Sequence, residues 1–287
     1  MIRIKCLPLR NSISFGRSET KPQPPTISVQ GLRHTYGGSG KATVEALAGV
    51  DLSVREGEFV ALVGPSGCGK STMLACIAGL IQPTAGAILI EGRPTTDALR
   101  RRRFGLVFQD PCLLPWRTVR ENIRLPLELA AAETPDHDPV GQLIKSVLLR
   151  GFEESYPSEL SGGMRSRVAI ARALVLSPAI LLMDEPFGAL DEITSSVLNM
   201  EIVQIWAERK PTVLLVTHSI SQAVFMADRV IVLTERPGRV STVVNVCLPR
   251  PRDINTAISN KEFVQSVAAV RQALGVGSGS LHSKLDK

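Results

Sequence analysis

The chain has 287 residues, of which 44% are hydrophobic, and its formal net charge at pH 7 is +6. This length and apolar content predict one large α/β domain, or one domain with an inserted lobe, around a sizeable core. No stretch has the roughly 18 apolar residues of a membrane span or the apolar core of a secretory signal, so we expect a cytosolic chain.

The first 26 residues are basic and end in a proline-rich run. They carry five basic side chains against one acidic side chain, and Pro22, Pro24 and Pro25 disfavour a helix there. We expect residues 1–26 to form a flexible basic arm, a solvated extension rather than a contact to lipid head groups. The charge of the whole chain permits an anionic membrane surface or nucleic acid as a neighbour but requires neither.

The five cysteines are scattered without metal-ligand spacing, and an odd number argues against a disulfide framework. We expect most of them to be small core residues. They are Cys6, Cys68, Cys76, Cys112 and Cys247.

Alternating apolar residues predict strands over 27–32 and 50–54, and the apolar run 59–63 predicts a buried strand. A glycine-rich loop follows with the spacing G-x-x-x-x-G-K-S, and it opens into a helix. Its backbone N–H groups and the helix N-terminus would hold phosphate oxygens. The nine residues of this phosphate loop are Gly64, Pro65, Ser66, Gly67, Cys68, Gly69, Lys70, Ser71 and Thr72.

Within the phosphate loop, Lys70 would reach the β- and γ-phosphates and the Ser71 hydroxyl would ligate Mg²⁺. The strand before it and the helix after it favour this interpretation over a plain strand-to-helix turn. We therefore predict that the chain binds a nucleoside triphosphate. Tyr36 is either an ordinary strand aromatic or a platform that stacks on a purine, and its position alone does not decide between them.

A strand is predicted over 87–90, and another over 104–108 ends at Gln109. Between them, Arg100–Arg103 is interpreted as a solvated charged face. The loop over 110–116 combines two prolines with an apolar cluster, which predicts a docking surface rather than a purely solvated connection.

Residues 117–160 show helical spacing and no strand pattern, which predicts a small helical lobe. Ser161, Gly162 and Gly163 then head a helix that runs to Leu174. These residues form a second helix N-terminus that can receive an anion. Since one nucleotide needs one phosphate site, this second site predicts a nucleotide shared between two copies of the chain.

The apolar run 179–183 predicts a central strand that ends at an acidic pair. Asp184 would hold Mg²⁺ and Glu185 would polarise the attacking water, an interpretation favoured over helix capping. The next buried strand, 212–216, ends at Thr217 and His218, and a histidine there would donate a hydrogen bond to the γ-phosphate.

The remaining elements are predicted as an amphipathic helix over 193–206, strands over 227–233 and 240–244, a linker over 249–252, and a final helix over 262–274 with a tail to residue 287.

In this order, the phosphate loop, Gln109, the Ser161–Gly163 segment, Asp184-Glu185 and His218 resemble the ATP-binding subunits of ABC transporters over residues 26–250. The resemblance implies an α/β fold: a P-loop NTPase core with an antiparallel β subdomain and an inserted helical lobe. It implies a domain over 27–250 with the lobe at about 117–175, and a linker, helix and tail over 251–287.

The resemblance also implies residue roles. Tyr36 is then the adenine-stacking aromatic, and Gln109 senses Mg²⁺ and water and couples to a membrane partner. Glu185 is the catalytic base, His218 is the switch histidine, and Asp191 ends the D-loop that starts at Ala189. Ser161, Gly162 and Gly163 bind the γ-phosphate held by the opposite subunit.

Segments 113–123, 236–239 and 248–252 resemble the nitrate, sulfonate and taurine importer ATPases. That resemblance implies a homodimer that hydrolyses ATP with Mg²⁺ at the cytoplasmic face of the membrane. Its partners would be a permease and, indirectly, a solute-binding protein, with no nucleic acid. A soluble ABC ATPase and a regulatory subunit with little turnover are the alternatives. Ser166, Ser219 and Gln222 depart from the family's usual Gln, Asp and Glu, beside the nucleotide site.

Overall fold

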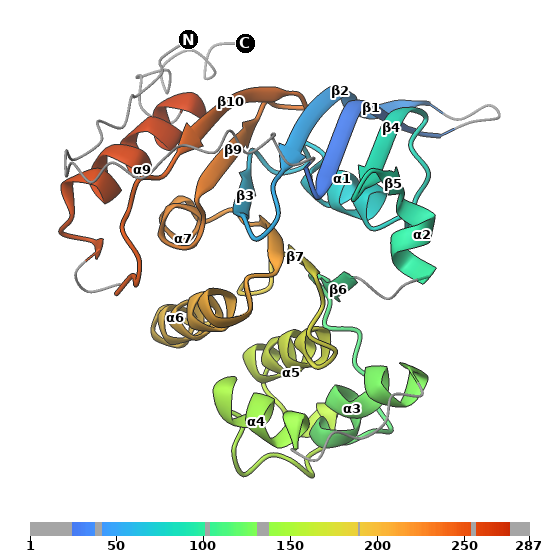
Figure 1. The fold of residues 1–287 in the computed structure, drawn as a ribbon, viewed down its shortest axis with the longest axis vertical. Helices are drawn as coiled ribbons and strands as arrows, with labels where there is room; N and C mark the ends of the chain where they lie inside the picture. The colour runs from blue at the N-terminus through green and yellow to red at the C-terminus, as the bar shows by residue number, and fades with distance from the viewer. Residues whose placement is uncertain are drawn as a thin grey trace, which may run out of the picture.

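A computed structural model describes residues 25–37, 42–100, 104–130, 138–188, 190–253 and 257–275. It contains two β-sheets, with helices packed on both faces of the larger sheet (Figure 1). None of the helices described is long and apolar enough to span a membrane. The predicted basic arm, most of the predicted C-terminal tail and Arg101–Arg103 lie outside the described residues.

The smaller sheet is antiparallel, as predicted for the β subdomain, with the strand order β2-β1-β4-β5. Its first two strands are longer than predicted, because register shifts let β1 continue past Leu32 while it stays paired with β2. The strands are β1 (Ile27–Tyr36), β2 (Val44–Val54), β4 (Ala85–Ile90) and β5 (Arg93–Pro94).

The larger sheet has six strands in the order β10-β9-β3-β8-β7-β6, and all but the edge strand β10 run parallel. Each of its central strands is buried on both faces, which explains the continuous apolar runs in the sequence. The strands are β3 (Phe59–Val63), β6 (Phe104–Val107), β7 (Ile180–Asp184), β8 (Thr212–Val216), β9 (Arg229–Leu233) and β10 (Val240–Asn245).

Two apolar cores lie on the two faces of the larger sheet. In β3, Phe59, Ala61 and Val63 belong to one core, while Val60 and Leu62 belong to the other, as the twofold period of a strand requires. The first core holds α5 (Gly162–Leu174), α6 (Glu192–Arg209), α7 (Ile220–Met226) and α9 (Lys261–Ala273). The second holds α1 (Lys70–Ile77) and the antiparallel sheet.

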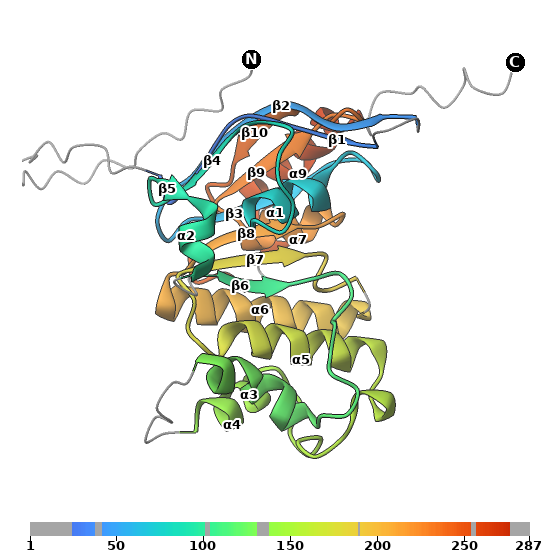
Figure 2. The same ribbon diagram turned by 90° about the vertical axis from the view of Figure 1, so that its right-hand side faces the viewer.

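The predicted helical lobe is present and lies at the end of the molecule away from the antiparallel sheet (Figure 2). It consists of α3 (Val119–Ala130), α4 (Pro139–Ser146), a short 3₁₀ turn (Pro157–Glu159) and α5. The fully buried Asn122 joins the lobe to the predicted docking loop. Its amide donates to the carbonyls of Leu114, Arg117 and Thr118, and its Oδ1 accepts from the Leu114 N–H.

The structure differs from the sequence-based expectations in three respects: its helices, its cysteines and its predicted linker. The sequence pattern does not predict α7, directly after His218, or α2 (Thr95–Arg100). Among the cysteines, Cys68 and Cys76 are buried free thiols, but Cys112 is exposed. Cys247 is disulfide-bonded, contrary to the inference from the odd cysteine count.

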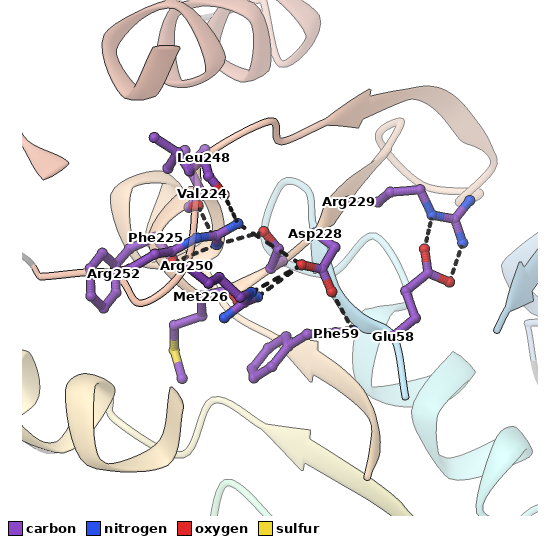
Figure 3. A network of polar contacts seen from close by, with 11 residues as sticks. Glu58, Phe59, Val224, Phe225, Met226, Asp228, Arg229, Leu248, Arg250 and Arg252 are labelled. Atoms are coloured by element: carbon purple, nitrogen blue, oxygen red, sulfur yellow. Dashed lines mark hydrogen bonds and ion pairs between the residues drawn. The ribbon is translucent and has the colours of Figure 1, made fainter. Parts of the chain in front are cut away.

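The third correction concerns the predicted linker at 249–252, which is packed against the C-terminal end of α7 (Figure 3). Arg252 is buried and donates to the carbonyls of Phe225 and Ala227 at 2.7 and 2.9 Å. Arg250 donates to the Met226 carbonyl and pairs with Asp228. Two arginines therefore satisfy carbonyls that a helix end leaves without partners, and burial lowers the pKa of Arg252 to about 10.

Candidate nucleotide-binding site

Four predicted functional segments meet along one edge of the larger sheet. The parallel strands β3, β8, β7 and β6 are neighbours in that order, so their carboxyl ends lie side by side. Gly64 follows β3, His218 follows β8, Glu185 follows β7, and Gln109 follows β6. This edge is where open α/β sheets bind their ligands.

The phosphate loop needs glycine for its conformation and for its close packing. Gly67 and Gly69 have φ of +74° and +99°, in the region that other residues rarely adopt. A Cβ on Gly69 would also lie 2.8 Å from the Ala46 carbonyl oxygen. The Lys70 side chain is buried and donates to the carbonyls of Gly64 and Pro65 at 2.9 and 3.0 Å. Its ammonium is thus held inside the loop, where phosphate oxygens would lie.

Helix α1 begins inside this loop and has no side-chain cap. Its N-cap is Gly69, and no acidic residue lies in its first turn. Its first backbone N–H groups therefore have no carboxylate or hydroxyl cap of their own, which suits the binding of an anion.

Tyr36 lies beside this helix although it comes from the antiparallel sheet. Its hydroxyl is 3.1 Å from Thr72 Oγ1, and its side chain is 46% exposed. The His34 and Tyr36 rings form a T-shaped pair with centroids 4.5 Å apart. His34 Nδ1 lies 3.1 Å from the Gln82 carbonyl oxygen. A partly exposed aromatic side chain next to the phosphate loop is compatible with the purine-stacking alternative.

Asp184 ends β7 with its side chain buried and hydrogen-bonded to Ser71. Burial raises the pKa of this carboxyl, and the Ser71 hydrogen bond opposes the rise. Its Oδ1 is buried without a hydrogen-bond partner among the described residues. A carboxylate and a hydroxyl are the oxygen ligands that Mg²⁺ prefers, so the two side chains fit that ion. Gln109, the third predicted ligand, is exposed at the end of the neighbouring strand.

Glu185 and His218 approach each other across the adjacent ends of β7 and β8. His218 Nδ1 lies 3.4 Å from Glu185 Oε2, and their side chains are 67% and 23% exposed. The Glu185 N–H donates to the Val216 carbonyl, so the ladder between these strands extends to the acidic residue. Glu185 also has φ of +46°, an unusual conformation for a residue with a side chain. Such outliers cluster at functional sites, where the surrounding structure holds them in place.

The second predicted anion site, at the start of α5, lies elsewhere. Ser161 is the N-cap of α5, and its Oγ accepts from the Met164 N–H at 3.3 Å. Since α5 and α1 belong to different cores, the two helix N-termini lie on opposite faces of the larger sheet. In the part of the chain that the structure describes, no hydrogen bond or ion pair joins Ser161, Gly162 or Gly163 to the phosphate loop.

Comparisons with known proteins agree with this geometry. The sequence model of a family described as ABC transporter matches residues 47–188. The aliphatic sulfonates import ATP-binding protein SsuB of Bacillus cereus is 42% identical over 242 residues, which cover 84% of this chain and 94% of that protein. The nitrate import ATP-binding protein NrtD of Synechococcus elongatus is 41% identical, over 77% of this chain and 81% of NrtD.

The chain belongs to the ABC transporter ATP-binding family. A dimeric structure of MJ0796, a bacterial ABC transporter cassette, matches this ABC ATPase with a TM-score of 0.71 and 36% identity. The match covers 78% of this chain and all of that cassette, and a second MJ0796 structure represents a post-hydrolysis state bound to ADP and Pi. The predicted family, fold and ATP-hydrolysing activity are confirmed.

In this ABC ATPase, Asp191 caps α6, and its Oδ1 accepts from the Thr194 N–H at 2.9 Å. Ala189, the first residue of the predicted D-loop, lies outside the described residues. The charge of Asp191 also acts on Arg167 of α5, whose pKa is lowered chiefly by burial.

Sequence reasoning missed Asn199, which is buried in the middle of α6. It accepts a hydrogen bond from Gln222, one of the three departures from the family pattern. Asn199 lies far from any motif, so no local pattern marks it. The other departures have local roles, because Ser166 Oγ donates to the Gly162 carbonyl and Ser219 caps α7.

Proposed function

We propose that this ABC ATPase energises an importer for a small anionic solute of the sulfonate or nitrate type, and that it works as a homodimer at the cytoplasmic face of the membrane. The observation that carries the proposal is the gathering of the phosphate loop, Asp184, Glu185 and His218 at one sheet edge. The solute class is supported by the printed functions of SsuB and NrtD. Taurine, named with these solutes by the sequence resemblance, belongs to the same class.

The proposed binding roles follow the positions of the side chains. Backbone N–H groups of the loop Gly64–Thr72 and the Lys70 ammonium bind the phosphates. The partly exposed Tyr36 ring stacks on the adenine. Ser71 and Asp184, with Gln109 beside them, would hold Mg²⁺, which neutralises charge on the phosphate oxygens when it is bound.

The proposed catalytic roles rest on the contact between the two adjacent strand ends. Glu185 orients the attacking water and accepts its proton on the carboxylate, which is partly shielded from solvent. His218 packs against that carboxylate and donates a hydrogen bond to the γ-phosphate. Because the two groups come from neighbouring strands, their spacing is set by the β7–β8 ladder.

A homodimer would complete each site. Ser161, Gly162 and Gly163 lie on the opposite face of the sheet from α1, so within one chain they do not enclose the phosphate that Lys70 binds. A second copy in a head-to-tail arrangement would bring them to the γ-phosphate, with Asp191 beside the same interface. The dimeric arrangement of the MJ0796 cassette supports this assembly.

The helical lobe and the loop over 110–116 are the proposed contact to the permease, with a solute-binding protein acting indirectly through it. Trp116 is 70% exposed in this loop. Arg172 of α5 donates to the carbonyls of Pro111 and Cys112, so the loop is tied to the helix that Ser161 heads. The proposed domain boundaries are a basic arm over 1–26, the ATPase domain over 27–250 and a C-terminal segment over 251–287.

The substitution Glu185→Gln tests the proposal. It keeps the side chain's size but removes its basicity, and we expect ATP hydrolysis to fall by about 10²- to 10⁴-fold while an ATP-bound dimer accumulates. Phosphate release and size-exclusion chromatography with ATP measure the two effects. Glu208→Gln, at an exposed position on α6, is the matched control. Normal hydrolysis by the Glu185 variant would show that Glu185 is not the base.

A regulatory subunit with little turnover is the second candidate, because Ser219 and Gln222 replace acidic residues expected beside the site. Steady-state phosphate release by the unmodified chain, with and without its membrane partner, separates the two. Turnover that the membrane partner stimulates supports the importer subunit, and slow turnover that this partner leaves unchanged supports the regulatory one.

A further inference from the structure

A buried chain of hydrogen bonds links α6 to the turn that carries His218. Gln222 Nε2 donates to Asn199 Oδ1 at 3.0 Å, and Thr217 Oγ1 donates to Gln222 Oε1 at 2.6 Å. Thr217 Oγ1 also accepts from the Ser219 N–H at 3.1 Å. Asn199, Gln222 and Thr217 are each at most 8% exposed.

The last of these bonds closes the backbone turn around His218. Thr217 and Ser219 flank the histidine on both sides, and the hydroxyl of one holds the N–H of the other. The Thr217 N–H in turn donates to the Leu62 carbonyl of β3. The direction of the His218 side chain toward Glu185 therefore depends on a hydroxyl whose own orientation is set by Gln222.

Both ends of α7 are fixed by side chains from other elements. At its C-terminal end Arg252 and Arg250 hold the helix carbonyls (Figure 3). At its N-terminal end the Gln222 amide connects it to Asn199 of α6, the neighbouring helix (Figure 1). Because Arg250 and Arg252 hold the C-terminal end of α7, a displacement of α6 acts mainly on the N-terminal end of α7, which adjoins His218.

The contact between α6 and α7 through Asn199 and Gln222 is polar, which indicates that it positions one helix relative to the other. Two apolar side chains of similar shape could fill the same space at little cost in stability. Amide hydrogen bonds instead demand one arrangement of donors and acceptors, so they fix the register between the two helices.

We propose that Gln222 and Asn199 are positioning residues, which couple the location of α6, capped at its start by Asp191, to the orientation of His218 beside Glu185. The proposal rests on the proposed function of His218 and Glu185. Neither Gln222 nor Asn199 touches the phosphate loop through any contact described here. Their loss should therefore lower kcat and leave the KM for ATP unchanged.

The test compares Gln222→Met and Asn199→Leu, which remove the polar atoms but keep similar volumes, with the wild-type chain. We expect kcat to fall about fivefold to tenfold, the loss of a typical hydrogen bond, with KM for ATP changed by less than about twofold. Asn199→Asp keeps an acceptor for the Gln222 amide and should restore kcat to within about twofold of wild type. Gln204→Met, the same substitution at an exposed position of α6, is the control.

If kcat falls equally in Asn199→Asp and Asn199→Leu, the proposal is wrong. A wild-type kcat in Gln222→Met would also overturn it. A fall in kcat that matches the fraction of unfolded protein would show a merely structural role. If Gln222→Met does not fold, the comparison of kcat between Asn199→Asp and Asn199→Leu tests the proposal instead. The proposed function fails separately if the wild-type chain does not hydrolyse ATP or if Glu185→Gln hydrolyses it normally.

Discussion

In the described part of the chain, the helix N-termini of α1 and α5 are both suited to an anion, and they are built differently. At the start of α1 the N-cap is a glycine without a side chain, and the buried Lys70 ammonium lies within the loop. At the start of α5 the exposed Ser161 satisfies the Met164 N–H with its own hydroxyl. The first end therefore leaves its backbone N–H groups without a side-chain cap, beside a buried ammonium. The second end is capped by its own serine, and under the proposed function it meets a phosphate that another copy of the chain binds.

The largest effect on ATP binding should come from removing the charge at the start of α1. Lys70→Ala removes the ammonium that would contact the phosphates, and truncating one partner of a buried charged contact typically costs a hundredfold or more in affinity. We expect ATP affinity, measured with a fluorescent ATP analogue, to fall at least about a hundredfold. Lys145→Ala, at an exposed position on α4, should bind ATP as wild type does. Retained affinity in Lys70→Ala would contradict the proposed cradle.

An intermediate effect, on ATP hydrolysis, should come from placing a negative charge at the start of α5. Ser161→Asp keeps a good helix cap but adds a carboxylate where the partner's γ-phosphate would approach. We expect hydrolysis to fall by about tenfold to a hundredfold through like-charge repulsion, while ATP affinity of the monomer is unchanged. Ser161→Asn, a neutral cap, is the control. Weaker ATP binding by the Ser161→Asp monomer would mean that both ends act within one chain.

The smallest effect concerns the alkylation rates of two free thiols: Cys68, which is buried in the phosphate loop, and Cys112, which is exposed in the loop over 110–116. Cys68 is 1% exposed, and burial raises the pKa of its thiol, whereas Cys112 is exposed. A raised pKa leaves less reactive thiolate at neutral pH, so Cys68 should alkylate at least about tenfold more slowly than Cys112 and speed up as pH rises.

Mass spectrometry of labelled peptides over time gives both rates, and Cys112→Ser removes the competing reaction. Once Cys68 is labelled, ATP binding should be lost, because the phosphate loop has no room for a label beside the Cys68 Sγ. Even a Cβ atom added to Gly64 would lie only 2.8 Å from that sulfur. Equal labelling rates for Cys68 and Cys112 would show that the loop opens in solution.

The order of the motifs along the chain was enough to predict which residues lie together at the carboxyl edge of the larger sheet. A parallel sheet collects the carboxyl ends of its strands, so Asp184 and His218 could be placed at one edge from the buried runs before them. Helix α7 was missed because it is short and its residues from Gln222 to Met226 are all buried, which leaves no amphipathic period to read. The prolines and arginines around Arg252 predict a linker, because such residues are typical of exposed chain; the contacts of Arg252 with the end of α7 are not visible in the sequence.

Residue type and local backbone geometry were enough to predict the phosphate loop, and an acidic pair and a histidine at strand ends. The folded chain was needed to show that α1 and α5 lie on opposite faces of one sheet, and that Asn199 contacts Gln222. Those facts depend on strand order and on contacts between residues far apart in the chain, such as positions 199 and 222, which no local pattern encodes.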